Sequence, residues 1–261
     1  MNVGGTYLMG QCLAGVGRHR MRRVLITGAS RGIGLELVRQ LVERGDRVFA
    51  GYRDASTAGR LLKLAADKHN RLTAVPLDVT DAASIDSAHD EVARNVDALD
   101  VLVNNAGVGS DSRDFDDVPA TRDFGHLEAG PMLRLIHTNS VAPIIVAQRF
   151  MDLLRRGTDP KVVSISSIVG SIAIKDYDGD HAYSASESAL NMFMRSLSAD
   201  LRGEGIIVAV VHPSWVRTDM GGPQGPVSIE ESVEGLLKVI DGLTMDQTGG
   251  FLDYRGHVLP W

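Results

Sequence analysis

Two side chains that can take part in proton transfer lie one helical turn apart in the stretch YSASESALNM. The helical spacing of the segment predicts that Tyr183 and Glu187 share one face of a helix. A tyrosine, with an ordinary pKa near ~10, exchanges protons near neutral pH only when its anion is stabilised. A neighbouring carboxylate does the opposite. The pair therefore indicates either an active site with an inverted charge or a helix surface without a catalytic role.

A second chemical signal is the glycine-rich turn in VLITGASRGIGLELVRQL. An apolar strand pattern precedes the three glycines and an amphipathic helix pattern follows them. Such a turn brings backbone amides against a pyrophosphate, and the helix N-terminus adds partial positive charge. The spacing Gly-x-x-x-Gly-x-Gly departs from the Gly-x-Gly-x-x-Gly fingerprint, but its position between strand and helix favours dinucleotide binding over an ordinary turn. The residues predicted to bind the dinucleotide here are Gly28, Ser30, Arg31, Gly32, Ile33 and Gly34.

The end of the next apolar run, FAGYRD, indicates which dinucleotide is bound. A carboxylate at this place would bond the ribose 2′-hydroxyl of NAD, whereas cations would pair with the 2′-phosphate of NADP. Arg53 comes first after the run and Arg31 lies in the glycine turn, so the sequence favours NADP(H). Asp54 follows directly, so NAD(H) is not excluded. A solvated loop charge is the alternative role for Arg53.

Strand-like and helix-like segments alternate from Arg23 onward. The apolar runs are near-continuous, as in parallel strands buried on both faces. The alternation predicts an α/β fold, a single domain with a doubly wound, mostly parallel sheet of the Rossmann type. The strand candidates are RVLITG, RVFAGY, LTAVPLDV, LDVLVNNAG, KVVSISS and GIIVAVVHPS. The helix candidates are GIGLELVRQLVERG, AASIDSAHDEVARNV, LIHTNSVAPIIVAQRFMDLLRRG and AYSASESALNMFMRSLSADLRGEG.

Composition and charge restrict the class of protein. The chain has 261 residues, 44% hydrophobic and 23% charged, which is typical of a globular protein with a sizeable core. Its formal net charge of −6 leaves no basic footprint for nucleic acid, and no basic amphipathic segment indicates a membrane surface. Cys12, the only cysteine, fits a reducing cytoplasm. No spacing of His, Asp or Glu is typical of a metal cage, so we predict a small-molecule partner and no metal.

Three segments are set apart from the predicted core. Residues 1–21 have an apolar run broken by glycines and lack the charge pattern of a signal peptide, so we expect a disordered leader before a cofactor-binding domain over residues 22–261. An alternative is that Met21 is the natural first residue. Residues 109–131 are polar and broken by Gly and Pro, which predicts an inserted loop with a short helix. Residues 221–232 are the predicted substrate lid.

The order of TGASRGIG, LDVTD, NNAG, ISS, the tyrosine and HPSWVRTDMGG resembles the short-chain dehydrogenase/reductase family over residues 23–261. The segments ISSIVGSIA, ALNM, VRTDMGG and LPW look most like the small carbonyl reductases of the sniffer and C-factor type. The resemblance implies hydride transfer between a nicotinamide cofactor and a carbonyl or alcohol. It also implies homodimers or homotetramers built on the helices that carry Asn139 and Tyr183, unless the inserted loop blocks that packing.

The resemblance also implies roles for individual residues. Ser167 would hydrogen-bond the substrate carbonyl, Tyr183 would exchange the hydroxyl proton, and Asn139 would hold a water in a proton relay. Glu187 stands where the family has its catalytic lysine. A polar strand end is the alternative for Ser167, and a surface position for Asn139. The further residues implied to contact the cofactor are Asp78 and Val79 at the adenine, Asn105, Ala106 and Gly107 along the adenosine, and Pro213, Val216 and Thr218 toward the nicotinamide and phosphates.

A glutamate in place of the lysine changes the expected chemistry. Unit charges about 5 Å apart at an effective dielectric constant of about 20 interact by roughly 3 kcal/mol, or about 2 pKa units. Repulsion in place of attraction would raise the pKa of Tyr183 by as much as about 5 units, and by less if Glu187 is hydrated or protonated. Neutral tyrosine remains a proton donor for carbonyl reduction, whereas alcohol oxidation needs its anion.

Three interpretations follow from Glu187. The first is a cofactor-binding protein with little dehydrogenase activity and a signalling or regulatory role. The second is a reductase in which Lys175, Lys161 or another cation, or a tuned Glu187, replaces the missing charge. The third is a lysine-to-glutamate change, natural or engineered, in an otherwise standard enzyme. A serine hydrolase is disfavoured, because SISSI lacks the flanking glycines of a nucleophile elbow.

Two further observations concern turns near the site. His181 and His212 are interpreted as structural or solvated, because isolated histidines in turns usually are. Ser214 stands where the family usually has glycine. If that position has a positive φ, the serine strains the turn by about 1 kcal/mol or more.

Overall fold

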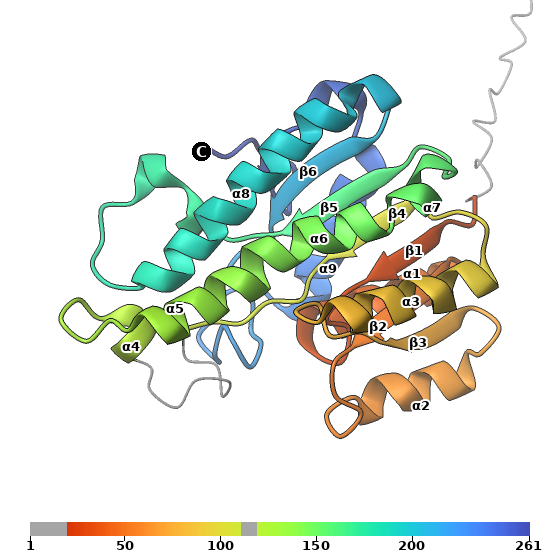
Figure 1. Cartoon of the computed structure of the whole chain (residues 1–261), viewed down its shortest axis with the longest axis horizontal. Coiled ribbons are helices and arrows are strands. Elements are labelled where there is room, and N and C mark those ends of the chain that lie inside the picture. Colours follow the sequence, from red (N-terminus) through yellow and green to blue (C-terminus); the bar gives the residue numbers. More distant parts are fainter. Residues whose placement is uncertain (1–19, 111–118) are drawn as a thin grey trace, which may run out of the picture.

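A parallel sheet forms the centre of the protein in the computed structural model, which describes residues 20–110 and 119–261 (Figure 1). Its seven strands follow the order β3-β2-β1-β4-β5-β6-β7. The chain moves outward from β1 in one direction and then returns to continue at β4, so the switch point of the strand order lies between β1 and β4. In open α/β sheets, ligands bind beside this point at the carboxyl ends of the strands. The strands are β1 (Arg23–Ile26), β2 (Arg47–Tyr52), β3 (Leu72–Pro76), β4 (Val101–Asn104), β5 (Lys161–Ile165), β6 (Ile207–His212) and β7 (Gly250–Asp253).

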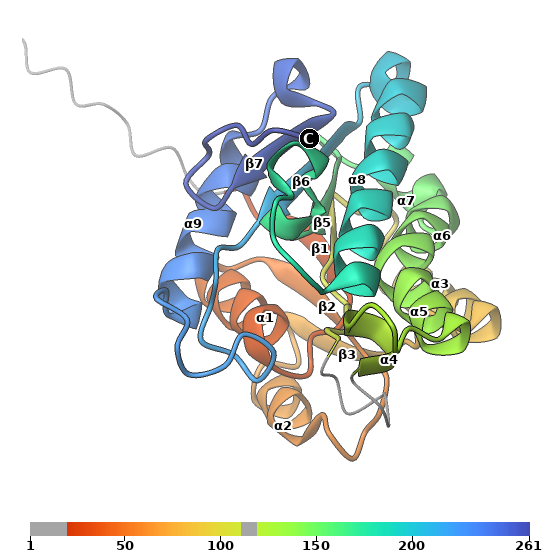
Figure 2. The same ribbon diagram turned by 90° about the vertical axis from the view of Figure 1, so that its left-hand side faces the viewer.

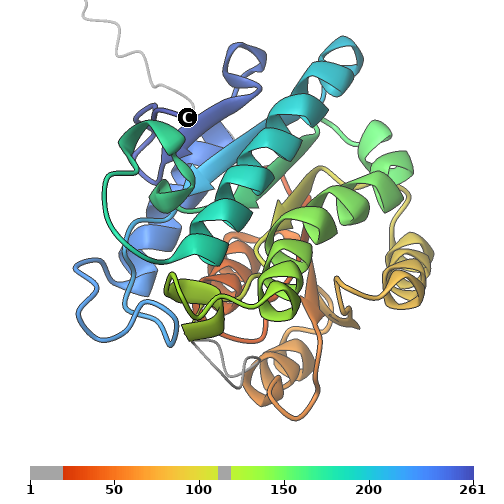
Figure 3. The same cartoon turned by 60° about the vertical axis from the view of Figure 1, so that its left-hand side comes forward.

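Helices cover both faces of this sheet, which Figures 2 and 3 show from two further sides. The helices are α1 (Gly32–Arg44), α2 (Gly59–Asp67), α3 (Ala82–Asn95), α4 (Pro119–Arg122), α5 (Ala129–Ile136), α6 (Ala142–Arg149), α7 (Met151–Arg155), α8 (His181–Leu201) and α9 (Ile229–Gly242). A π-helical turn, η1 (His137–Val141), joins α5 to α6. Short 3₁₀ turns are η2 (Ile168–Gly170), η3 (Ile172–Ile174), η4 (Arg202–Glu204) and η5 (Met245–Gln247).

Successive strand residues point to opposite faces and so build two cores. Ile26 and Ala50 pack with α1 and α9 in one core. Leu25 and Phe49, one position earlier, pack with α3, α6 and α8 in the other. Burial of each large apolar side chain stabilises the fold by about 1.5–3 kcal/mol. The near-continuous apolar runs of the sequence thus become strands that are buried on both faces.

The predicted Rossmann-type fold is confirmed, with three elements that the sequence analysis did not identify: α2, α9 and β7. The predicted lid is wrong in its second part, because α9 already begins at Ile229. Within the predicted inserted loop, α4 is the short helix and α5 begins at Ala129. Residues 111–118 of that loop lie outside the described residues.

The predicted leader lies almost wholly outside the described residues, which begin at Arg20. Arg20 already donates a hydrogen bond from its Nη2 to the Thr158 hydroxyl, at 2.6 Å. Among the helices of the described chain, none combines the length and the apolar character that a bilayer span requires.

Candidate active site

The glycine turn after β1 fits closely against the chain that leaves β4. Gly28 has φ 64°, and a Cβ atom there would lie 2.6 Å from the Ala106 Cα. The Asn105 side-chain amide donates to the carbonyl oxygens of Thr27 and Gly28, at 3.0 Å each. A Cβ atom at Gly34 would collide with this same amide and with the Gly28 carbonyl. The turn therefore requires glycine, and Asn105 holds its shape.

The N-terminus of α1 presents the features of an anion site. Arg31 is the N-cap residue, with an extended φ of −157° and no side-chain cap, and no acidic residue lies in the first turn. The first backbone amides of the helix are thus available to a ligand, and they carry the positive end of the helix dipole. A Cβ atom at Gly32 would lie 3.8 Å from the Thr218 methyl group, so the loop after β6 borders this site. These donors fit a pyrophosphate.

The turn after β2 separates the roles of Arg53 and Asp54. Both residues are exposed. The Asp54 carboxylate accepts a hydrogen bond from the Ser56 amide at 2.8 Å, and hydrogen bonds with Ser56 lower its pKa. Arg31 forms an exposed ion pair, its Nη1 lying 3.7 Å from the Asp219 carboxylate. The Asp54 carboxylate thus stabilises the turn that contains it. The guanidinium groups of Arg31 and Arg53 are the side chains that suit a 2′-phosphate.

The other predicted cofactor residues border the same edge of the sheet. Asp78 Oδ1 accepts hydrogen bonds from the Thr80 amide at 2.9 Å and from its hydroxyl at 2.7 Å. The side chains of Val79 and Val216 are buried in the fold, with 8% and 4% exposed, so only their backbones can face a cofactor. Gly107 lies beside Asn139, whose Oδ1 would be 3.5 Å from a Cβ atom there.

The loop after β6 contains a strained residue. Ser214 has φ 77°, so the condition for strain at this position is met, at a cost of about 1–2 kcal/mol for a residue other than glycine. The Pro213 carbonyl accepts a hydrogen bond from the hydroxyl of Ser232 at 2.7 Å. Ser232 is fully buried in the first turn of α9, so this helix anchors the strained loop. The sequence analysis did not identify Ser232, because α9 was not predicted.

Ser167 and Tyr183 come together across two elements. Ser167 follows β5 and caps the turn η2, while Tyr183 lies in the first turn of α8. The Ser167 hydroxyl is close enough to lower the pKa of the tyrosine. The tyrosine is partly buried and packs against the small cluster of Leu135 and Ala182. This arrangement places two hydroxyl groups side by side at the carboxyl edge of the sheet.

Asn139 occupies the π-helical turn between α5 and α6, a distortion that is frequent at functional sites. It is 3% exposed, so the alternative of a surface position is wrong. Its Oδ1 accepts from the Val108 amide and its Nδ2 donates to the Val108 carbonyl, both at 2.9 Å. The same Nδ2 donates to Ser186 Oγ at 3.0 Å and is 3.5 Å from Glu187 Oε1. Asn139 thus links the chain after β4 to α8.

Glu187 lies inside this site and not on the surface. Only 5% of Glu187 is exposed to solvent. The helix is in direct contact with the turn after Ser167, since a Cβ atom at Gly170 would lie 2.7 Å from the Glu187 Cβ. The Ser188 hydroxyl donates to the Gly170 carbonyl at 2.9 Å and holds this contact. Gly170 is a positioning residue that the sequence analysis missed, although ISSIVGSIA contains it.

The two titratable groups of α8 have strongly shifted pKa values. Burial raises the pKa of Glu187 to about 7, and the neighbouring Ser166 and Ser167 oppose this rise. Burial also raises the pKa of Tyr183 well above its usual value, and the charge of Glu187 adds to this effect. The neighbouring Ser167 hydroxyl lowers the pKa of Tyr183 in part. The predicted direction for Tyr183 is confirmed, but desolvation outweighs the charge to which the sequence argument attributed it.

The lysines considered as replacements for the missing charge have other partners. Lys161 is wholly buried at the start of β5, away from the edge that carries Ser167, and is paired with Asp159. The proposal that it replaces the charge is therefore wrong. The ammonium group of Lys175 lies 3.4 Å from the centre of the Tyr177 ring and donates to the Gly179 carbonyl at 2.9 Å. Neither lysine is among the groups that shift the pKa of Tyr183.

The histidines near the site have structural surroundings. His212 Nδ1 accepts a hydrogen bond from the Ile168 amide at 3.2 Å, which fixes the turn after Ser167. Burial lowers the pKa of His212 to about 4, so the imidazole is neutral near neutral pH. His181 is exposed at the start of α8. Both observations agree with the predicted structural or solvated roles.

Comparison with known proteins identifies the family. A sequence model of the short chain dehydrogenase family matches residues 22–226. The C-signal protein of Myxococcus xanthus is 39% identical over 163 residues, which cover 62% of this chain and 93% of that protein. The carbonyl reductase Sniffer of D. melanogaster has a TM-score of 0.85 and 31% identity over 93% of this chain and 100% of that chain.

A second solved structure, an NADPH-bound carbonyl reductase from chicken fatty liver, has a TM-score of 0.82 and 36% identity. It covers 93% of this chain, and the whole of its own chain is matched. The predicted resemblance is thereby confirmed, including its sniffer and C-factor branch. The chain belongs to the short-chain dehydrogenase/reductase family.

Proposed function

We propose that the protein is an NADP(H)-dependent oxidoreductase that reduces a carbonyl compound to an alcohol. The observation that carries this proposal is that Ser167, after β5, and Tyr183, in the first turn of α8, interact at the sheet edge that also holds the glycine turn. In an open α/β sheet, ligands bind at this edge beside the switch point. The solved relatives described as carbonyl reductases, one of them NADPH-bound, support the same activity.

The residues of the glycine turn and of α1 would hold the cofactor phosphates, and Arg53 with Arg31 would pair with the 2′-phosphate. Asp78, Val79 and the chain from Asn105 to Gly107 would border the adenosine. Pro213, Val216 and Thr218 would border the nicotinamide half. When bound, NADPH supplies a hydride to the carbonyl carbon.

The protein's own groups then control the proton. The Ser167 hydroxyl donates to the carbonyl oxygen and fixes its position. Tyr183, neutral because its pKa is raised, donates its proton to the same oxygen as negative charge develops there. Asn139 holds the neighbouring backbone in place through its paired bonds to Val108. A small-molecule substrate, a cytoplasmic location and a homodimeric or homotetrameric assembly complete this proposal.

The proposal is tested by following NADPH and NADH oxidation with a panel of aromatic and aliphatic carbonyl compounds. Tyr183→Phe is the matched control, because it removes one hydroxyl group and keeps the ring that packs against the cluster of Leu135 and Ala182. We expect turnover with NADPH in preference to NADH, and a loss of about a hundredfold or more in kcat in the variant. Equal rates for the protein and the variant would refute the role of Tyr183.

A second candidate function is cofactor binding with little dehydrogenase activity and a signalling or regulatory role. The raised pKa of Tyr183 and the strained Ser214 turn favour it, and one relative carries the name C-signal. The same assay separates the two candidates. Tight NADPH binding, with no oxidation by any carbonyl compound above the rate in buffer, would support this second function.

A further inference from the structure

The Glu187 carboxyl group is buried in the site with one oxygen unsatisfied. Oε1 is 3.5 Å from the Asn139 amide nitrogen, a long hydrogen bond. Oε2 has no hydrogen-bond partner among the residues that the structure describes. Buried polar atoms are nearly always paired with protein or with ordered water, so Oε2 is expected to meet a further group in the working protein.

Among the described residues no cation shifts the pKa of the Glu187 carboxyl group. The other charged or titratable groups that act on Tyr183 are Asp180 and Tyr177, and Lys175 and His212 are not among the groups that shift either pKa. Asp180 accepts a hydrogen bond from the Ser110 hydroxyl at 2.7 Å and is itself negative. Lys175 is held by the Tyr177 ring, and His212 is neutral. A buried carboxyl group without a cation favours its uncharged form, in agreement with a pKa of about 7.

We infer that Glu187 and Tyr183 form a two-residue acid–base pair, in which Glu187, as an uncharged carboxylic acid, replaces the proton that Tyr183 gives to the substrate. The two residues lie one turn apart on α8 and their charges interact. Tyrosinate is disfavoured by burial, so the negative charge left by proton transfer resides on the more acidic partner. The inference rests on the proposed reductase function and assigns Glu187 a purpose within it.

The proton balance is complete without a further reagent. As the carbonyl carbon gains its hydride, the O–H bond of Tyr183 breaks and that of the alcohol forms. The O–H bond of Glu187 then breaks, and its proton passes across one bridging water to the tyrosine oxygen. The carboxylate of Glu187 recovers a proton from solvent. One solvent proton is consumed for each carbonyl group reduced, and in alcohol oxidation every transfer runs in reverse.

This pair makes a specific prediction for pH dependence. Carbonyl reduction needs Glu187 protonated, so kcat/KM for reduction falls about tenfold per pH unit above a pKa of about 7. Alcohol oxidation needs Glu187 ionised, so its kcat/KM rises with pH and levels off above the same pKa of about 7. In Glu187→Gln, which cannot ionise, both breaks move to the much higher pKa of Tyr183.

The first test is infrared spectroscopy of the protein without cofactor, as a difference between it and Glu187→Gln across a pH series. We expect the carbonyl absorption of a protonated carboxyl group, replaced by carboxylate absorption as the pH rises through about 7. Glu234→Gln is the matched control, because the Glu234 carboxylate pairs with Lys238 and its pKa is lowered. A carboxylate signal from Glu187 already at pH values two units below neutrality would overturn the inference.

The second test is the pH profile of carbonyl reduction in the protein, in Glu187→Gln and in Glu234→Gln. We expect the profile of kcat/KM to break near neutral pH in the unchanged protein and in Glu234→Gln. We expect no such break in Glu187→Gln. Identical profiles in all three would overturn the inference. Because the infrared test needs neither cofactor nor substrate, an ionised Glu187 refutes only the acid–base pair. A protonated Glu187 in a protein that oxidises no NADPH refutes the reductase function instead.

Discussion

Asp100 and Glu187 are both buried carboxyl groups, with 2% and 5% of each residue exposed. Asp100 lies just before β4, at the amino edge of the sheet, and every lone-pair direction is used. Arg23 donates to it from Nε at 2.9 Å and from Nη2 at 2.7 Å, and the Thr158 amide donates at 2.8 Å. Against the effect of burial, these bonds hold the pKa of Asp100 below its usual range.

Glu187, toward the opposite edge, has one long hydrogen bond and an unpaired oxygen, and burial raises its pKa to about 7. Burial alone therefore does not determine the charge of a carboxyl group. Its partners do, because they replace the hydration that the folded chain removes. The charge of Asp100, at the amino edge of the sheet, is fully compensated by its partners. The charge of Glu187, toward the carboxyl edge where ligands bind, is not.

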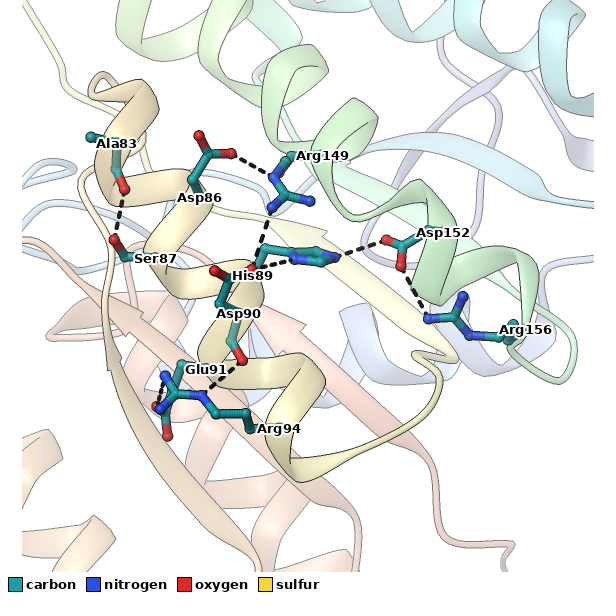
Figure 4. A network of polar contacts seen from close by, with 10 residues as sticks. All are labelled: Ala83, Asp86, Ser87, His89, Asp90, Glu91, Arg94, Arg149, Asp152 and Arg156. Atoms are coloured by element: carbon teal, nitrogen blue, oxygen red, sulfur yellow. Dashed lines mark hydrogen bonds and ion pairs between the residues drawn. The ribbon is translucent and has the colours of Figure 1, made fainter.

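A third arrangement lies between α3 and α7, where Figure 4 shows a network of paired charges. His89 lies between two carboxylates, 2.9 Å from Asp152 Oδ1 and 3.2 Å from Asp90 Oδ1. Arg156 donates to Asp152 at 3.0 Å. The Asp152 and Arg156 side chains are about half exposed, at 48% and 53%, so water already stabilises their charges. Of the three arrangements, this network is expected to contribute least to the free energy of unfolding.

The largest effect is expected at Asp100. Arg23→Met keeps much of the side-chain stem but leaves a buried carboxylate without its bidentate partner. The free energy of unfolding is expected to fall by about 3–5 kcal/mol, toward the lower limit because the Arg23 side chain is 23% exposed. Urea denaturation near neutral pH measures this, with the surface variant Arg156→Met as control. A loss below about 1 kcal/mol would show that Asp100 does not depend on Arg23.

The next effect is expected at Glu187 and depends on pH. Its pKa of about 7 in the folded chain exceeds the ordinary value of 4.5, so the unfolded chain ionises first as pH rises. Stability is therefore full below about 4.5 and is lost up to about 7, by about 3 kcal/mol in total. Glu187→Gln should remove this loss and gain stability relative to the natural sequence on the alkaline side. If the difference in the free energy of unfolding between the protein and Glu187→Gln were the same at acid and alkaline pH, the raised pKa of Glu187 would be contradicted.

The smallest effect is expected in the α3–α7 network. His89→Gln removes an imidazole that bonds to partly exposed carboxylates and contacts the edge of Phe150, with ring centroids 5.4 Å apart. We expect the free energy of unfolding to fall by about 1 kcal/mol or less. Thermal unfolding of this variant beside Arg23→Met measures the difference directly. A loss as large as that in Arg23→Met would remove the distinction between buried and half-exposed charges.

The sequence was sufficient for the fold class, although it did not show α2, α9 and β7, and the roles of the candidate residues stay predictions. Some features depend only on residues that are close together in the chain, so they can be identified from the sequence. These are the strand and helix periods, the glycine turn and the spacing of Tyr183 from Glu187. The sequence could not show that Lys161 lies at the far edge of the sheet or that Gly170 touches Glu187, because each depends on segments that meet only in the folded chain. The π-helical turn at Asn139 likewise depends on its bonds to Val108, which belongs to another segment.

The relative weight of burial and charge at Tyr183 also needed the structure. A charge can be counted from the sequence, whereas desolvation depends on what covers the hydroxyl group. The Tyr183 ring packs against the cluster of Leu135 and Ala182, and Leu135 belongs to α5, outside α8. The sequence argument thus obtained the direction of the pKa shift from the smaller of its two main causes.

The central claim is that burial, with the charge of Glu187 added to it, raises the pKa of Tyr183, so that proton transfer is slower than with the lysine that the family has at this position. The most direct measurement compares NADPH oxidation with a carbonyl panel in this protein and in Glu187→Lys under identical conditions. The account predicts a slow but Tyr183-dependent rate in the protein and a gain of about a hundredfold or more in the variant, because the ammonium group lowers the pKa of Tyr183. Rapid turnover by the protein, with no gain in the variant, would contradict it.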